Sequence, residues 1–172
     1  MALLPIIIAP DPRLRMKTVP VDQVDDEARV FMENMLETMY AANGIGLAAP
    51  QVGDERSVIV VDCARKEEAP RPIKMANPEI IEVSAERSIQ EEGCLSLPEH
   101  YAEIVRPKSI RMRYLDDTNS IQELNAEGML ATCIQHEIDH LSGVLFIDHI
   151  SSIKRKMILR KLKKTKKYSS KN

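Results

Sequence analysis

The sequence of 172 residues is poor in aromatic side chains: it has no tryptophan, two phenylalanines and four tyrosines. Proteins that bind single-stranded nucleic acid by stacking need several exposed rings, so the composition disfavours that mode of binding. The sequence also lacks any run of about 18 to 20 apolar residues, the length needed to span a bilayer. We therefore expect neither DNA nor a membrane among the partners.

Disulfide and export signals are also missing. Cys63, Cys94 and Cys133 form an odd set without the spacing of a disulfide framework. Residues 1–10 are apolar but have no basic segment and are interrupted by Pro5, so they resemble an arm packed on the domain more than a signal peptide. Both features favour a reducing compartment, and we expect a cytoplasmic protein. The length predicts one domain.

Charge is unevenly distributed along the chain. Ten of the 24 lysines and arginines lie in residues 154–172, which contain no acid, so the rest of the chain holds 14 bases against 26 acids. The simplest interpretation of this tail is a solvated helix end. The alternative is a tail that binds a polyanion, because clustered basic side chains neutralise phosphates additively.

The hydrophobic pattern predicts an α+β fold of short strands with mixed and antiparallel pairing, and three helices, of which one lies toward each end of the chain and one between them. The N-terminal helix is expected from about Asp25 to Asn43, and a loop of small residues should follow over 44–53. The central helix should begin near Ala126 and end at Gly143, and a third helix should begin near Ser151. Strands are expected at 57–61, 73–75, 79–83, 101–105, 110–115 and 121–124.

The strongest motif is His136-Glu137-Ile138-Asp139-His140. Histidines at i and i+4 lie on one helical face, so their nitrogens can bind one ion, and Glu137 is placed to take a proton from a water at that ion. A catalytic ion of this kind has three protein ligands and one open position. The alternative is a surface helix with two solvated histidines, but the apolar residues around the motif favour burial. Arg106 is a candidate partner for Asp139.

The third ligand separates the classes of HExxH enzyme. Metzincins need a histidine six residues after His140, where this chain has Phe146, and gluzincins need a downstream glutamate, which is missing after Gly143. The remaining candidates are Cys94, between a glycine and a nearby proline in a segment typical of a tight loop, and Cys133, on the same helix as the histidines. We favour Cys94, because three ligands from one helix would crowd a tetrahedral ion.

Three segments resemble the signature motifs of the peptide deformylase family in sequence, order and spacing: Gly44-Ile45-Gly46-Leu47-Ala48-Ala49-Pro50-Gln51, Glu92-Gly93-Cys94-Leu95-Ser96 and Gln135-His136-Glu137-Ile138-Asp139-His140-Leu141. The resemblance covers nearly the whole chain. It implies an α+β fold in which short, largely antiparallel strands pack around a central metal-binding HExxH helix. The whole chain, 1–172, would be a single deformylase-like catalytic domain, with 154–172 as its basic C-terminal helix or tail. Tyr101 departs from the family pattern, since many bacterial members have arginine there.

The resemblance implies a role for each matching residue. Cys94, His136 and His140 would bind the metal, which in the family is natively Fe(2+), with Zn(2+), Ni(2+) or Co(2+) able to replace it. Glu137 would act as general base and then as acid. The Gln51 side chain and the Leu95 backbone N–H would stabilise the oxyanion. Residues expected to contact the substrate are Ile45, Gly46, Gly93, Met129, Cys133 and Tyr101.

The implied activity is removal of the N-formyl group from the formyl-methionine of nascent proteins, with release of formate. Formylmethionyl peptides would be the substrates, and the ribosome is a candidate partner, since some family members dock on it through a C-terminal helix. Two alternatives remain open at this point. One is an HExxH metallopeptidase. The other is a non-catalytic, metal-stabilised ribosome-binding module, although a closed structural site would want four protein ligands.

Overall fold

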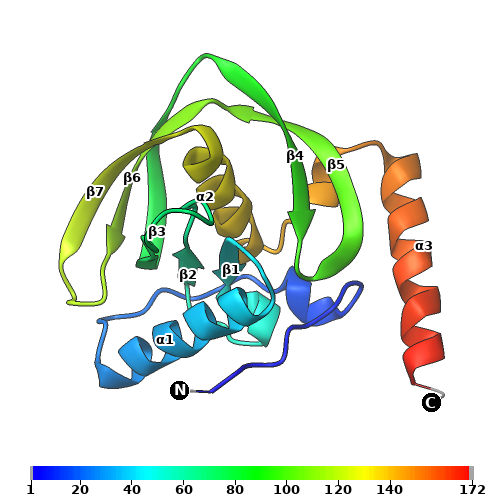
Figure 1. The fold of residues 1–172 in the computed structure, drawn as a ribbon, viewed down its shortest axis with the longest axis horizontal. Coiled ribbons are helices and arrows are strands. Elements are labelled where there is room, and N and C mark those ends of the chain that lie inside the picture. The colour runs from blue at the N-terminus through cyan, green and yellow to red at the C-terminus, as the bar shows by residue number, and fades with distance from the viewer. Residues whose placement is uncertain (1, 171–172) are drawn as a thin grey trace.

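The computed structural model describes residues 2–170, which form three α-helices, two antiparallel sheets and three short 3-10 helices (Figure 1). The α-helices are α1 (Asp26–Ala41), α2 (Gly128–Leu141) and α3 (Ser152–Ser169). The strands are β1 (Gly46–Ala48), β2 (Val58–Val61), β3 (Ile73–Val83), β4 (Arg87–Cys94), β5 (Leu97–Pro107), β6 (Ser109–Leu115) and β7 (Ile121–Glu127). The predicted α+β class is confirmed.

The larger sheet has the strand order β1-β2-β3-β6-β7, and β4 and β5 form a separate hairpin. Every pair of neighbouring strands is antiparallel. In Figure 1 the hairpin stands beside α3, and α2 lies between the hairpin and the larger sheet. Within residues 2–170, no helix is both long enough and apolar enough to cross a bilayer.

Strand β2 is buried on both faces, which explains its unbroken apolar sequence. Val58 and Val60 pack in one core cluster with the methionines of α1, whereas Ile59 and Val61 pack in a second cluster with residues of α2. The two helices therefore cover opposite faces of the larger sheet. A third cluster joins the N-terminal arm, the β4–β5 hairpin and α3.

The helix boundaries follow capping chemistry. The Asp25 side chain accepts a hydrogen bond from the Ala28 N–H at 2.9 Å, and Asn43, with a φ of 56°, lies just beyond the end of α1. The Ser151 hydroxyl likewise accepts from the Lys154 N–H at the start of α3. The predicted N-terminal and C-terminal helices are confirmed.

The N-terminal arm is packed on the domain, as its sequence predicted. The Ile7 N–H donates to the Gln51 carbonyl at 2.7 Å, and the Ala9 N–H donates to the Ser96 carbonyl at 2.8 Å. Gln51 and Ser96 belong to two different sequence motifs. The arm therefore ties together the two segments that carry them.

Five details of the predicted fold are wrong. No strand was predicted over 87–94, where the chain forms β4. Residues 44–53 include strand β1, because Gly46 pairs with Val61 of β2. The predicted strands 73–75 and 79–83 are one 11-residue strand, β3, in which a register shift after Ala76 accommodates Pro78. Strand β5 also has 11 residues, so these two strands are not short. The chain continues as β7 to Glu127, and α2 begins only at Gly128.

Candidate metal centre

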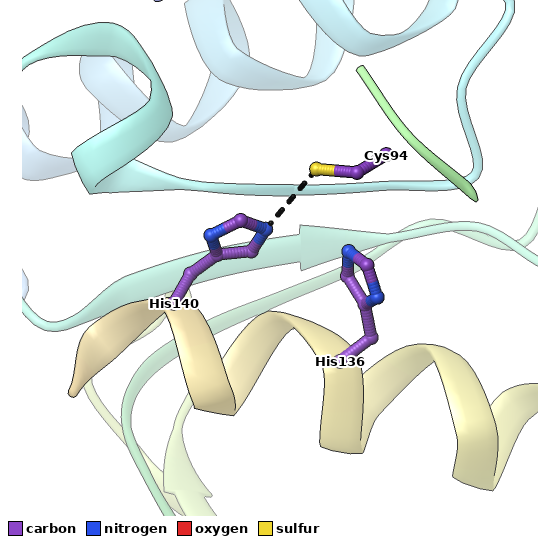
Figure 2. Close-up of side chains that lie close together, drawn as sticks. All are labelled: Cys94, His136 and His140. Atoms are coloured by element: carbon purple, nitrogen blue, oxygen red, sulfur yellow. Dashed lines mark hydrogen bonds between the residues drawn. The ribbon is translucent and has the colours of Figure 1, made fainter. Parts of the chain in front are cut away.

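The structure brings together the three predicted metal ligands (Figure 2). Cys94 ends β4, and His136 and His140 face it from α2, which is the face that the i, i+4 spacing predicts. One ligand atom of each lies within 4.8 Å of the others. The Cys94 Sγ atom is 3.4 Å from Nε2 of His140, which is fully buried.

This donor set fits a metal ion. Tetrahedral ligands about 2.0 to 2.3 Å from a shared ion lie about 3.3 to 3.8 Å apart. The distance of 3.4 Å between Sγ of Cys94 and Nε2 of His140 matches that spacing. A thiolate with two imidazoles suits a soft or borderline ion and leaves one tetrahedral position open. Among residues 2–170, the buried side-chain polar atoms without a hydrogen-bond partner are Oε2 of Glu137 and Nδ1 of His140, both at this site.

The end of β4 is shaped to present the thiol. The β4–β5 register shifts between Gly93 and Cys94, so that Cys94 pairs with Leu97 across a tight turn. The Tyr101 ring covers Gly93, where an added Cβ would lie 2.6 Å from a ring carbon. Glycine at position 93 thus lets the aromatic ring lie against the strand immediately before the ligand.

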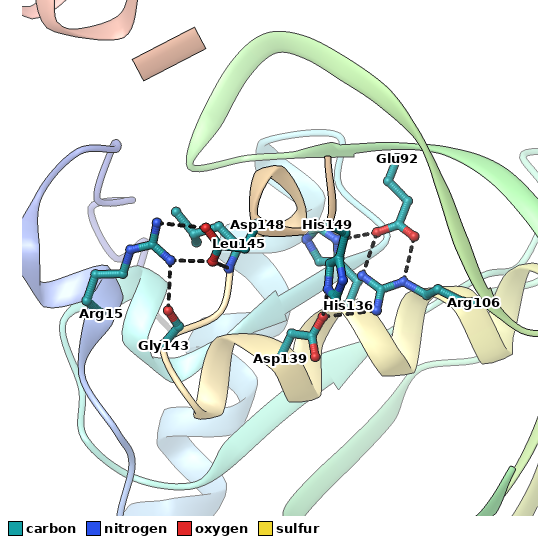
Figure 3. Close-up of polar contacts among 9 residues, drawn as sticks. All are labelled: Arg15, Glu92, Arg106, His136, Asp139, Gly143, Leu145, Asp148 and His149. Carbon is teal, nitrogen blue, oxygen red and sulfur yellow. Dashed lines mark hydrogen bonds and ion pairs between the residues drawn. The ribbon is translucent and has the colours of Figure 1, made fainter. Parts of the chain in front are cut away.

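A buried ionic network orients His136 (Figure 3). Its Nδ1 lies 2.9 Å from Oε1 of Glu92, which leaves Nε2 as the nitrogen available to an ion. Arg106 donates to both Glu92 oxygens at 2.7 and 2.9 Å and to Asp139 at 2.9 Å. Asp139 also lies 2.8 Å from Nε2 of His149. The predicted pairing of Arg106 with Asp139 is confirmed.

The electrostatics of Glu92 favour its charged form. Burial raises the pKa of this carboxyl, but the hydrogen bonds from His136 and Arg106 outweigh burial, so the pKa lies below its ordinary value. Sequence reasoning did not assign Glu92 a role. The available signal was its place two residues before the thiol, on a strand whose inward positions are polar.

Glu137 is buried beside β1. Its Oε1 lies so close to Gly46 that a Cβ added there would be 2.4 Å away, and the same Cβ would be 2.8 Å from Sγ of Cys133. Burial raises the pKa of Glu137 to about 7. A carboxyl that titrates near neutrality is suited to accept and then return a proton.

Gln51 is held in one orientation by the turn after β1. Its Oε1 accepts a hydrogen bond from the Ala48 N–H at 2.9 Å, so its amide nitrogen must point the other way. That nitrogen lies 3.1 Å from Oγ of Ser96 and 3.4 Å from Sγ of Cys94. Gln51 therefore directs an N–H donor toward the ligand cluster.

A cleft of about 410 Å³ opens over the cluster. The residues lining it include Ile45, Gly46, Gln51, Gly93, Cys94, Leu95, Tyr101, His136 and Glu137. Two predicted substrate contacts lie outside this lining. Met129 is 53% exposed, whereas Cys133 is buried behind the cleft, where its thiol donates to the Ile45 carbonyl at 3.5 Å.

Known proteins with the same sequence pattern share this fold. The family model described as polypeptide deformylase matches residues 3–156. The peptide deformylase of Mesorhizobium japonicum is 53% identical over 167 residues, which is 97% of this chain and 95% of the relative. That of Methylocella silvestris is 55% identical over 170 residues, 97% of this chain and 87% of the relative.

Solved structures agree with the sequence matches. The crystal structure of peptide deformylase from Ehrlichia chaffeensis has a TM-score of 0.93 at 37% identity and covers 98% of this chain and 99% of its own. A crystal structure of the Ehrlichia chaffeensis protein in complex with actinonin has a TM-score of 0.92 at 39% identity, with 96% and 98% covered.

Proposed function

We propose a role for each residue of the site, starting from the family to which the chain belongs. The chain is a member of the peptide deformylase family, a metal-dependent hydrolase that removes the N-formyl group from nascent proteins. The observation that supports these roles is the convergence of Cys94, His136 and His140 beside a buried Glu137, at the base of one cleft. An HExxH metallopeptidase and a non-catalytic module are not favoured, because relatives that match over nearly the full chain are peptide deformylases.

Cys94, His136 and His140 hold the metal, and we propose Fe(2+) as the native ion, with Zn(2+), Ni(2+) or Co(2+) able to replace it. When bound, the ion supplies Lewis acidity toward the formyl oxygen and lowers the pKa of a water in the site. The Cys94 thiolate is a softer donor than a third imidazole and suits Fe(2+) or Zn(2+). Glu92 orients the His136 ring through Nδ1.

Glu137 moves the proton. As base it accepts a proton from the water that attacks the formyl carbon. As acid it returns that proton to the nitrogen of methionine when the carbon–nitrogen bond breaks, so that formate and a free amine leave. Its burial and its pKa of about 7 suit both roles.

Gln51 and Leu95 stabilise the negative oxygen that develops on the formyl group. The Gln51 amide N–H is already directed at the site by the Ala48 N–H, so no reorientation is needed during the reaction. The Leu95 backbone N–H lies on the turn that follows Cys94. Loss of one such donor typically lowers the rate by about 10²- to 10³-fold.

The substrate binds as an extended peptide along β1 and the end of β4. Ile45, Gly46 and Gly93 offer main-chain groups, which bind peptides without regard to their side chains. Position 46 requires glycine because β1 passes so close to Glu137 that any side chain there would collide with the Glu137 carboxylate. We place the methionine side chain near Ile45 and Cys133, with Tyr101 at the rim and Met129 on the outside of the wall.

We further propose that residues 1–172 form one catalytic domain that works in the cytoplasm, where nascent chains carry the formyl group. The exposed lysines of residues 154–167, within the basic segment 154–172, suit ribosomal RNA phosphates. Removal of 163–172 should weaken co-sedimentation with ribosomes at low salt. Unchanged co-sedimentation would rule out the ribosome contact without affecting the assigned activity.

The decisive assay measures formate release from formyl-Met-Ala-Ser by protein loaded anaerobically with Fe(2+). Glu137→Gln should keep its metal and lose activity by about 10²- to 10⁴-fold. Glu67→Gln, at an exposed carboxyl outside the cleft lining, is the matched control and should behave as wild type. Metal-loaded protein that releases no formate, or that cleaves unformylated peptides, would contradict the proposed roles.

A further inference from the structure

Tyr101 lies between the active-site cleft and a second groove. Tyr101 is 65% exposed, and it lines the cleft on one side and, on the other, a hollow of about 420 Å³ between β5 and α3. In Figure 1 these two elements stand side by side on the face that carries the hairpin. Because Tyr101 is shared by both hollows, a peptide that leaves the cleft over its ring enters the groove directly.

Helix α3 provides one wall of the groove. Lys154, Met157 and Lys161 follow one another at i, i+3 and i+7 and therefore form a stripe along one side of the helix. The stripe is about 10 Å long, since seven residues of helix rise about 1.5 Å each. That length matches roughly three residues of extended peptide at about 3.3 Å per residue.

The helix is fixed firmly enough to form a wall. Leu162 is buried in the core cluster that also contains Phe146, and Ile158 packs against the same cluster. The Ser151 hydroxyl caps the first turn of α3. The groove is therefore formed by two packed elements of the fold.

The charges of the groove are unbalanced. Lys154 and Lys161 face Glu103 of β5, so the lining has a net positive charge. None of these three residues takes part in an ion pair within residues 2–170. Between the lysines, Met157 is half exposed and offers an apolar surface. An occupant with acidic side chains on both sides of an apolar one would complement this lining.

We propose that the groove between β5 and α3 binds the residues of the formylated substrate that follow the third, and that Lys154 and Lys161 favour acidic side chains at those positions. The proposal rests on the deformylase function assigned above. It makes α3 a determinant of substrate choice among nascent chains, in addition to the main-chain recognition in the cleft.

The test compares kcat/KM for three peptides. Formyl-Met-Ala-Ser reports the chemistry alone, because it is too short to reach the groove. Formyl-Met-Ala-Ser-Glu-Leu-Glu and formyl-Met-Ala-Ser-Lys-Leu-Lys differ only in the charge presented to α3. The acidic hexapeptide should be preferred over the basic one by about three- to tenfold at low ionic strength, as expected for two partly exposed ion pairs.

Two double variants separate the groove from the general charge of the helix. Lys154→Glu with Lys161→Glu should reverse the preference. Lys156→Glu with Lys164→Glu changes the net charge by the same amount at exposed positions of α3 outside the groove, and should keep the wild-type preference. Each variant's rates are divided by its own rate with the tripeptide.

The outcomes are distinguishable. If the tripeptide is turned over and both hexapeptides react at equal rates, the proposal that the groove binds the substrate is wrong, and the deformylase function is unaffected. If both double variants lost the preference equally, the preference would come from the overall charge of α3. That result would also overturn the proposal that the groove binds the substrate. No tripeptide turnover by the metal-loaded protein would overturn the deformylase function, and this inference with it.

Discussion

The Nδ1 atom of His136 lies 2.9 Å from Oε1 of Glu92, and both oxygens of that carboxylate also accept hydrogen bonds from Arg106. The position of a metal ligand on α2 thus depends on a carboxylate of β4. A carboxylate behind a ligating imidazole fixes the ring and raises its basicity. Glu92 is therefore a positioning residue for the metal.

Glu92→Gln should weaken metal binding by about 10-fold or more, because it removes the charge that faces both His136 and Arg106. Competition with a chromophoric chelator measures this directly. Glu91→Gln is the matched control, since its exposed side chain lies on the opposite face of β4. Equal metal affinity in the two variants would show that the buried carboxylate does not support the ligand.

Removal of the metal by a chelator should abolish activity and lower the thermal midpoint, and addition of Fe(2+) should restore both. A ligand present at about 100 times its dissociation constant stabilises the folded state by about 2.7 kcal/mol. Cys94→Ala should lose the metal-dependent shift. Cys63→Ala should keep it, because Cys63 lies outside the ligand cluster. If the metal raised the thermal midpoint of Cys94→Ala as much as that of the wild type, Cys94 would not be a metal ligand.

Gln51→Glu should lower kcat by about 10²-fold or more with little effect on KM, because it replaces the N–H donor near Cys94 by a negative oxygen. Ser96→Ala is the comparison, since it removes only the second partner of the Gln51 amide nitrogen. It should have a much smaller effect. A kcat for Gln51→Glu within tenfold of wild type would exclude Gln51 from oxyanion stabilisation.

Acid should weaken the attachment of the segment before α3. Burial raises the pKa of Asp148, but hydrogen bonds from Arg15 and from the Leu145 N–H outweigh burial, and the pKa lies below its ordinary value of 3.8. Because the folded-state pKa is depressed, the stabilisation is present above about pH 4 and is lost as pH falls through the folded pKa.

Asp148→Asn should therefore lower the free energy of unfolding by about 1 kcal/mol at pH 7, and by progressively less as the solution is acidified. Urea denaturation between pH 3 and pH 7 measures the difference. Asp22→Asn, an exposed carboxyl outside the ion pairs of residues 2–170, should show no such trend. A pH-independent cost for Asp148→Asn would contradict the depressed pKa.

The sequence predicted the parts of the site that depend on local spacing. The i, i+4 spacing puts the two histidines on one face of α2. The apolar periodicity predicted α1, whose ends lie within two residues of those expected. The ion pair of Arg106 with Asp139 agrees with the candidate partner named from the sequence.

The rest depends on contacts between distant segments. Strand β4 was missed because Gln90 and Glu92 face inward where apolar residues are expected. Within residues 2–170, the side chains that bind the Glu92 carboxylate are Arg106 and His136, which lie far from it in the sequence. The strand conformation of Gly46 arises from its pairing with β2. No periodicity along the chain could reveal the groove beyond Tyr101, since it exists only where β5 and α3 pack together.

The division of the ligands between a hairpin and a helix has a kinetic consequence. Cys94 meets His136 and His140 only after β4 and β5 have paired and docked on α2, an event that closes a long loop and is therefore slow compared with helix formation. Metal capture should then be among the last steps of folding. A thiolate-to-cobalt absorption band, followed during refolding with Co(2+), would report the arrival of the hairpin, independently of the signal from the helices.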